Sequence, residues 1–179
     1  MASLTRTHTA DLDGHLRADL HAFLVEAFDG DFAEEDWEHA LGGVHVLVRE
    51  ADEIVAHASV VQRRLVVGAL GVRTGYVEGV AVRADRRGEG LGAAVMGTAE
   101  EIVRSAYDLG GLGAGDDAAA FYRRRGWSSW SGPTWVLAPD GPRRTEGEDG
   151  GIFVLPTPTS PKLDFSAPLM CDWRPGDVW

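Results

Sequence analysis

The stretch of residues 75–92 constrains the fold of this chain more than any other, because it reads as a strand, a glycine-rich turn and the start of a helix. The strand is rich in valine, and the turn holds Arg87, Gly88 and Gly90 before a helix expected over residues 91–109. The first backbone N–H groups of such a helix have no intrahelical partner, and their dipoles favour an anion. We therefore expect this turn to bind a diphosphate.

The spacing within the turn distinguishes it from other phosphate-binding loops. Arg87, Gly90 and Gly92 follow the pattern Arg-x-x-Gly-x-Gly. A P-loop needs Gly-Lys-Ser/Thr, which this stretch lacks. The turn resembles the pyrophosphate loop with which the Gcn5-related N-acetyltransferases bind coenzyme A. The resemblance implies a site for acetyl-CoA formed by Val80, Val82, Arg87, Gly88, Gly90 and Gly92.

Length and composition indicate one domain with a substantial core. The 179 residues are 44% hydrophobic and 25% charged, which is ordinary for a globular protein and too short for two typical domains. Cys171 is the one cysteine, so no internal disulfide forms. The sequence has no apolar run of the kind that exports a chain or spans a bilayer. We predict a single domain over residues 1–179, cytoplasmic and without a membrane partner.

The formal net charge of -11 argues against a nucleic-acid partner and favours a cationic one. Acidity can equally serve solubility, so the placement of the acidic residues matters. Three clusters stand out: Asp31, Glu34, Glu35 and Asp36; Glu148 and Asp149; and Asp172, Asp177 and the terminal carboxylate of Trp179. In the last cluster Trp173 and Trp179 are expected to pack as apolar anchors and hold the charges in place.

The order of expected elements indicates an α/β fold, with a mixed central sheet flanked by helices. A helix over residues 16–28 precedes a short helix over residues 33–41, which Asp31 is expected to cap. Strands follow over residues 44–49, 54–67 and 72–82, the first two as a hairpin, and later elements over residues 110–115, 116–125, 127–137 and 152–155.

Glu78 is the first candidate for chemistry. Alternation along the strand places it on one face with Tyr76, Val80 and Val82, so it is an acid on an apolar stripe. Such a carboxylate is either a member of a structural ion pair or a functional group. As a base toward an amine it requires a water relay, because a Glu pKa of about 4.3 lies far below an amine pKa of about 10.4. If the strand bulges at Gly79, the Val80 N–H can bind a thioester oxygen.

Tyr122 is the second candidate, as an acid that protonates a departing thiolate. Its ring can instead simply pack in the core, and the neighbouring residues 123–125, all arginine, are expected to make its hydroxyl more acidic. No Gly-x-Ser-x-Gly or Cys-His signature is present, which disfavours an acyl-enzyme. The six histidines show no metal-ligand spacing, so no metal is expected, and His45 and His57 are interpreted as structural.

Longer segments resemble the aminoglycoside 2′-N-acetyltransferase family within that superfamily, nearly from end to end. They are Gly30-Asp-Phe, Asp36-Trp-Glu-His, residues 75–85, Arg125-Gly-Trp, Phe153-Val-Leu-Pro and residues 171–179. The resemblance implies acetyl-CoA-dependent N-acetylation of the 2′-amino group of cationic aminoglycosides, by direct transfer in a homodimeric enzyme that confers resistance.

The resemblance also assigns roles to individual residues. Glu78 is implied as the base acting through water and Tyr122 as the acid. Substrate contacts are implied for Asp31, Asp36, Glu148, Asp177 and Trp179. Glu148 departs from the aspartate that the family carries, and Gly113 lies in a segment where relatives have serines. Glu89 adds a negative charge that must point away from a bound phosphate. Acetylation of another polyamine or amino sugar, and a non-catalytic module that binds coenzyme A or polycations, stay open as alternatives.

Overall fold

The computed structural model describes residues 2–179, which divide into two compact units. Unit 1 takes the described residues up to Val61 together with Val77–Ile102, and unit 2 takes Gln62–Tyr76 and Val103–Trp179. The division passes through two strands and a helix and does not fall in a linker.

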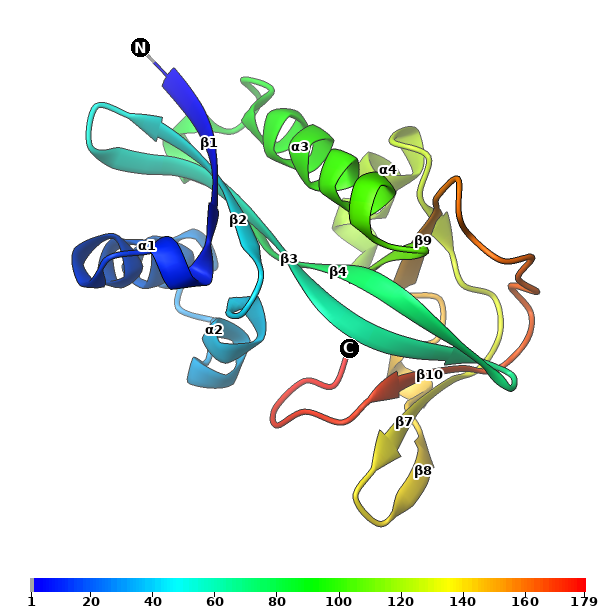
Figure 1. The fold of residues 1–179 in the computed structure, drawn as a ribbon. Coiled ribbons are helices and arrows are strands. Elements are labelled where there is room, and N and C mark those ends of the chain that lie inside the picture. The colour runs from blue at the N-terminus through cyan, green and yellow to red at the C-terminus, as the bar shows by residue number, and fades with distance from the viewer. Residues whose placement is uncertain (1) are drawn as a thin grey trace. The chain divides into compact units, whose positions relative to one another are not determined.

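Unit 1 is built on antiparallel strands. β1 (Ala2–His8) pairs with β2 (Val44–Glu50), and β2 pairs with β3 (Glu53–Val67) along the part of β3 that lies in this unit. The end of β4 (Leu70–Val82) runs beside β3, and Arg83 N donates to Val55 O at 3.0 Å. Figure 1 shows this order from blue through cyan to green.

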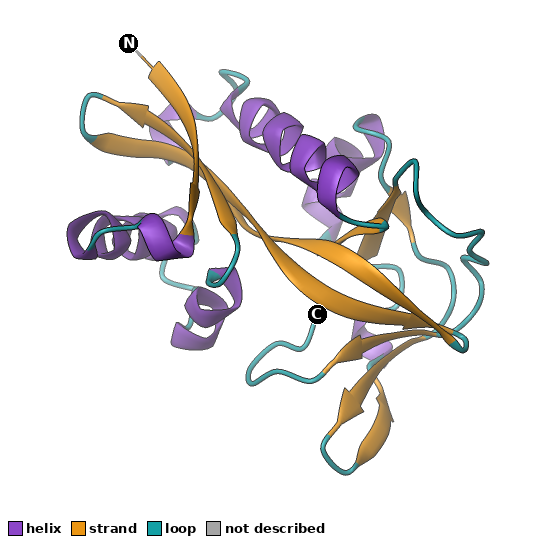
Figure 2. Ribbon diagram, viewed as in Figure 1, coloured by secondary structure: helices purple, strands orange, loops and turns teal. Residues whose placement is uncertain are grey.

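Helices cover these strands. They are α1 (Gly14–Ala27), α2 (Glu34–Ala40) and α3 (Leu91–Ala106), with 3-10 turns at η1 (Thr9–Asp11) and η2 (Ala84–Arg86). Figure 2 draws α1 and α3 on different sides of the strands. The core beneath α1 and α2 consists of Leu12, Leu20, Phe23, Leu24, Trp37, Leu47, Ile54 and Ala81.

The caps of the first two helices correct one expectation. Asp13 caps α1, where its carboxylate accepts the N–H groups of His15 and Leu16 at 2.9 and 2.8 Å. Asp31 does not cap α2, because the helix begins after Ala33, whose N–H donates to the carboxylate of Asp36 at 2.9 Å. An acid three residues into a helix can reach back in this way, so Asp36 replaces the missing cap.

Unit 2 contains the strand order β6-β9-β5-β4-β3-β10-β7-β8. β5 (Leu109–Gly113) lies parallel to β4 and antiparallel to β9 (Ile152–Pro156), which also pairs with β6 (Ser128–Ser129). α4 (Asp116–Arg124) joins β5 to β6.

The other side of unit 2 includes the C-terminal segment. β10 (Leu169–Asp172) is antiparallel to β3 and parallel to β7 (Thr134–Ala138). β7 continues through a hairpin into β8 (Gly141–Arg144), drawn in yellow in Figure 1, and the short turn η3 (Glu146–Glu148) follows.

The mixed sheet flanked by helices is confirmed, and so is the hairpin of β2 and β3. β1 and β10 are strands that the sequence pattern missed. β1 is exposed on both faces apart from Thr7, so it shows no apolar alternation, and β10 follows an irregular proline-containing stretch. The strand expected over residues 127–137 is two strands, β6 and β7. No helix among residues 2–179 is long and apolar enough to cross a membrane.

Candidate functional site

The residues proposed from the sequence divide between the two units. Unit 1 holds Glu78, Val80, Val82, Arg87, Gly88, Gly90, Gly92, Asp31 and Asp36. Unit 2 holds Tyr122, Glu148, Asp177 and Trp179.

The turn before α3 has the backbone that a phosphate cradle needs. The first α-helical hydrogen bond of α3 runs from Ala94 N to Gly90 O at 3.0 Å, so the N–H groups just before Ala94 have no intrahelical partner. Gly88 and Gly90 both have φ of +84°, and open space lies where a Cβ would stand. A side chain at either position would strain the turn and fill the space from which an anion approaches.

Arg87 fixes one edge of this turn. Its guanidinium donates to Val82 O at the end of β4 at 3.3 Å and to Ala27 O at the end of α1 at 3.1 Å. The side chain is exposed. Arg87 therefore ties three elements of unit 1 together and places a positive charge beside the turn.

Arg86 compensates the charge of Glu89 inside the turn. Its guanidinium donates to the Glu89 carboxylate at 2.7 and 3.0 Å and also pairs with Glu50 of β2. These carboxylates raise the pKa of Arg86, and Arg86 lowers the pKa of Glu50. The additional acid is thus part of a three-residue ion-pair network, which the sequence pattern did not indicate.

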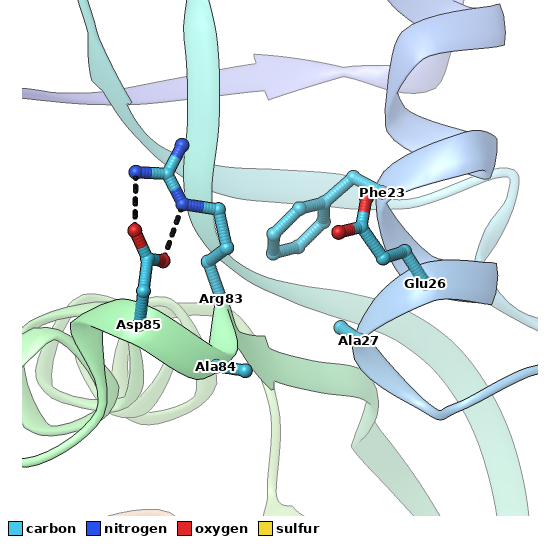
Figure 3. Close-up of a pocket in the computed structure, with 6 residues that line it drawn as sticks. All are labelled: Phe23, Glu26, Ala27, Arg83, Ala84 and Asp85. Atoms are coloured by element: carbon cyan, nitrogen blue, oxygen red, sulfur yellow. Dashed lines mark hydrogen bonds and ion pairs between the residues drawn. The ribbon is translucent and has the colours of Figure 1, made fainter.

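A cavity of about 350 Å³ opens between the end of α1 and the end of β4. Figure 3 shows its walls, with Phe23, Glu26 and Ala27 on α1 facing residues 83–85. Arg83 is fixed there by two hydrogen bonds to Asp85, at 2.6 and 3.2 Å. None of these residues was predicted from the sequence to line a cavity, because the cavity exists only once α1 lies beside the η2 turn.

β4 is interrupted next to Glu78. Gly79 has φ of +58°, which is a left-handed conformation outside the extended region, and we call residues 78–80 the Gly79 kink. The kink ends the simple alternation expected across residues 76–82. Glu78 and Val80 are both half-buried beside it.

Two buried side chains of β3 bind the carbonyl groups of the Gly79 kink. Ser59 Oγ donates to Glu78 O at 3.2 Å, and His57 Nδ1 donates to Gly79 O at 2.7 Å. Both side chains have no exposed area. A Cβ at Gly79 would stand 3.3 Å from two atoms of the His57 ring, so glycine suits both the backbone and the contact.

His57 belongs to a longer buried chain of hydrogen bonds. His45 Nδ1 lies 3.0 Å from His57 Nε2, and Thr9 Oγ1 lies 2.8 Å from His45 Nε2. The Thr9 hydroxyl in turn accepts the N–H of Gly42 at 2.9 Å. Burial lowers the pKa of His45 to about 4 and that of His57 to about 3, so both rings are neutral at physiological pH.

The acidic candidates of unit 1 differ in their surroundings. Asp31 is exposed in the turn after α1. Asp36 is half-buried, and besides its bond to Ala33 it lies 4.0 Å from His39 Nδ1. Asp36 therefore contributes to the local fold whatever else it binds.

Tyr122 is buried on α4, among aromatic rings. The rings of Phe121, Trp127 and Phe153 lie 5.2, 6.3 and 6.0 Å from its own. Burial raises the pKa of Tyr122 to about 12, Arg125 opposes this, and Asp117 adds to it. The expectation that adjacent arginines make the hydroxyl more acidic is wrong in its net sign, because loss of solvation exceeds the effect of Arg125.

The C-terminal tail is tied to unit 2 by Arg63 of β3. Its buried guanidinium donates to the carboxylate and the carbonyl of Asp172 at 3.0 and 2.9 Å and to the carbonyl of Val178 at 2.8 Å. The Cys171 thiol also donates to Val178 O at 3.2 Å. Both ends of the segment 172–178 are thereby held to one side chain.

Trp179 anchors the end of the tail, and Trp173 does not. The indole of Trp179 is 4% exposed and donates to Thr145 Oγ1 at 2.9 Å, whereas Trp173 is 45% exposed. Asp177 accepts the N–H of Trp179 at 3.0 Å, and Arg174 donates to the carbonyl of Asp177 at 2.9 Å and to the terminal carboxylate of Trp179. The expectation of two anchors is wrong for Trp173, which lies beyond the end of β10.

Glu148 and Asp177 form an acidic pair in unit 2. Glu148 is half-buried, and its pKa is raised by burial and by the charge of Asp177. Asp149 has a different role, because Arg144 and Thr134 hold its carboxylate and lower its pKa. Among residues 2–179, no group of three His, Cys, Asp or Glu side chains is arranged to hold a metal ion.

The comparisons with known proteins agree on an acetyltransferase. Residues 12–127 match the acetyltransferase (GNAT) family. The chain is 51% identical to an aminoglycoside 2′-N-acetyltransferase of Mycolicibacterium fortuitum over 174 residues, which cover 96% of this chain and 89% of the relative.

Solved structures share the fold. An acyl-CoA N-acyltransferase of Pseudomonas aeruginosa superposes with a TM-score of 0.62 at 17% identity, over 86% of this chain and 99% of its own. A GNAT family acetyltransferase of Brucella melitensis in complex with acetyl-CoA gives a TM-score of 0.59 at 16% identity, over 90% of this chain and 94% of its own.

The two buried histidines predict that the folded protein loses stability as the pH falls. Unfolded histidines titrate near pH 6.5. In the folded protein the pKa of His45 is about 4, because burial and the charges of His8 and Arg17 oppose its protonation. The pKa of His57 is about 3, because burial and the charge of His45 oppose its protonation. Between these pH values the unfolded chain binds more protons, so stability falls as pH drops from about 6.5 to about 4, by roughly 3 kcal/mol for each histidine.

Urea unfolding at pH 7 and pH 4.5 measures this loss. A His57→Asn variant should lose part of the pH dependence, and the matched change His15→Gln at an exposed histidine should keep it. Equal pH dependence in all three proteins would show that the buried pair does not resist protonation.

Proposed function

The chain belongs to the acetyltransferase (GNAT) family and, within it, to the aminoglycoside 2′-N-acetyltransferases, and we propose on this basis that it transfers the acetyl group of acetyl-CoA to the 2′-amine of an aminoglycoside. The observation that carries the proposal is the 51% identity with the M. fortuitum enzyme across 96% of this chain. The proposal includes a homodimer and resistance of the host cell to the drug.

The turn before α3 fits the diphosphate of coenzyme A. Its glycines leave the approach open, and the start of α3 supplies N–H donors and the positive end of the helix dipole. Arg87 adds a positive charge, while Arg86 compensates Glu89. Val80 and Val82 lie on β4 before the turn, where they would contact the pantetheine arm. Acetyl-CoA supplies an acetyl group activated as a thioester.

Glu78 is the proposed base. As the amine nitrogen bonds to the acetyl carbon and the carbon–sulfur bond breaks, the amine must lose a proton, which a water molecule would pass to the Glu78 carboxylate. Glu78 is half-buried beside the Gly79 kink and lies two residues before Val80, which supports this role. The Val80 N–H is the proposed donor to the carbonyl oxygen.

Tyr122 is the proposed partner of the departing sulfur. With its pKa at about 12, the hydroxyl stays protonated at neutral pH. Complete proton transfer to a thiolate with a pKa of about 8.5 would be uphill by about 5 kcal/mol. With this pKa, Tyr122 is better suited to donate a hydrogen bond to the thiolate than to transfer its proton to it.

The aminoglycoside would be bound by acidic groups. In unit 2 these are Glu148, Asp177 and the terminal carboxylate, which the anchored indole of Trp179 holds in place. In unit 1 they are Asp31 and Asp36. Burial and, to a smaller extent, the charge of Asp177 raise the pKa of Glu148, and an ammonium group bound beside it would offset both effects.

Kanamycin B and kanamycin A test the position of transfer, because they differ only in an amine or a hydroxyl at the 2′ carbon. Thiol release should be rapid with kanamycin B, with NMR of the product showing acetylation at the 2′ nitrogen. With kanamycin A, kcat/KM should be lower by about a hundredfold or more. Equal turnover of both drugs would refute the 2′ position, and the absence of thiol release with any amine would refute the activity.

Glu78→Gln and Tyr122→Phe should each lower kcat by about 10² to 10³, with smaller changes in either KM, because each removes a group needed in the transition state. Steady-state kinetics with acetyl-CoA and kanamycin B provides the measurement. Glu101→Gln and Tyr107→Phe are the matched controls and should keep normal kcat. Loss of affinity at unchanged kcat would contradict the two assignments.

Asp177→Asn should raise the KM for the aminoglycoside about tenfold, since a charge-assisted contact contributes about 1.5 kcal/mol. The KM for acetyl-CoA should not change. Asp140→Asn removes the same charge from the exposed turn after β7 and serves as the control. If both variants change the KM alike, the effect is one of overall charge and the assignment of Asp177 is wrong.

A further inference from the structure

The peptide group between Gly79 and Val80 is held from inside unit 1. Its carbonyl accepts from His57 Nδ1 at 2.7 Å, and the preceding carbonyl, of Glu78, accepts from Ser59 Oγ at 3.2 Å. His57 and Ser59 are two residues apart on β3, so they lie on the same face of that strand. Two consecutive carbonyls of the Gly79 kink are therefore bound by side chains.

The same peptide group carries the Val80 N–H, which is the proposed donor to the thioester oxygen. Because a peptide group is planar, the direction of its carbonyl sets the direction of its N–H. A hydrogen bond accepted by the carbonyl also polarises the group and strengthens its N–H as a donor. The contact from His57 thus acts on both the orientation and the strength of that donor.

We propose that His57 is a positioning residue for acetyl transfer, and that its hydrogen bond to Gly79 orients and polarises the Val80 N–H that stabilises the developing negative charge. This inference rests on the proposed function of the kink. His57 acts through the backbone and does not touch the substrate.

The Gly79 carbonyl fixes which nitrogen of His57 carries the proton, and the rest of the buried chain is compatible with that tautomer. A carbonyl only accepts, so His57 must hold its proton on Nδ1 and accept on Nε2 from His45 Nδ1. His45 then accepts on Nε2 from the hydroxyl of Thr9, which lies 2.8 Å from His45 and 3.2 Å from its other acceptor, the Gly43 carbonyl; the Gly42 N–H donates to the same oxygen. A ring of the other tautomer would leave the Gly79 carbonyl without this donor.

The direction of the chain excludes a proton relay. It ends on the Gly79 carbonyl, which cannot pass a proton onward. The neutrality of both rings at physiological pH agrees with a fixed donor. His45 and Thr9 consequently serve to orient His57.

Nitrogen NMR of the imidazole rings in the wild-type protein tests the first step without any activity. Both His45 and His57 should show protonated Nδ1 and unprotonated Nε2 at pH 7. A His57 ring protonated on Nε2 would overturn the inference, even if the protein acetylates kanamycin B normally.

Two polar variants test the second step. In His57→Asn the amide nitrogen can take the place of Nδ1 and keep the bond to Gly79, whereas in His57→Gln the amide lies near the place of Nε2 and loses it. With kanamycin B, His57→Gln should lower kcat about tenfold at nearly constant KM, and His57→Asn should restore kcat to within about threefold of wild type. The Val80 amide resonance should shift more in His57→Gln than in His57→Asn.

A stability-matched control separates positioning from packing. Val46 is fully buried on β2, and Val46→Ala should lower the free energy of unfolding and leave kcat unchanged. Equal kcat in the two His57 variants, or a kcat that follows stability across all three proteins, would overturn the inference. If the wild type releases no thiol, the proposed function fails, while the imidazole and Val80 resonances still decide the geometry.

Discussion

The hydrogen bond from His57 to the Gly79 carbonyl links the interior of unit 1 to the strand that carries Glu78. A left-handed residue near the end of β4 gives up regular ladder geometry, and its partly buried carbonyl needs another partner. β3 supplies that partner as the imidazole of His57, whose tautomer the carbonyl requires and whose other nitrogen faces His45. The kink is therefore part of the folded core and not a local irregularity of a flexible loop.

The tail of unit 2 depends on a comparable arrangement. Arg63 is almost fully buried, and a buried guanidinium is tolerable only when its donors are used. Asp172 provides the opposite charge at Nε, and two carbonyls of the tail accept from Nη2. Removing Arg63, or the tail groups that it binds, would leave a buried polar or charged group without its partner. The core of unit 2 and residues 172–178 therefore stabilise each other.

The acidic residues that give this chain its net charge of -11 differ in the partners that the fold gives them. Asp149 and Asp172 are bound by arginines, and Asp36 caps its own helix. The pKa of Glu148 is instead raised, first by burial and then by the charge of Asp177. A cationic ligand gains the most electrostatic binding energy beside carboxylates that lie near other negative charges and have no arginine partner.

The elements around the glycine turn could be predicted from the sequence alone, because apolar periodicity and glycine placement are local properties. The β2–β3 hairpin, β4, α3, α4 and the mixed sheet follow from them. β1 and β10 could not be predicted, since their pairing partners lie far away along the chain and their own residues show no clear alternation. The same limit explains why Trp173 was mistaken for an anchor.

The sequence by itself determined the family, the turn before α3 and the identity of Glu78 and Tyr122 as candidates, because these rest on residue type and spacing. Only the tertiary structure decided that His57 and Ser59 bind the Gly79 kink, that Arg63 holds the tail, and that burial raises the pKa of Tyr122. The physical reason is that hydrogen-bond partners and solvation belong to neighbours in space, which the order of residues along a chain does not specify.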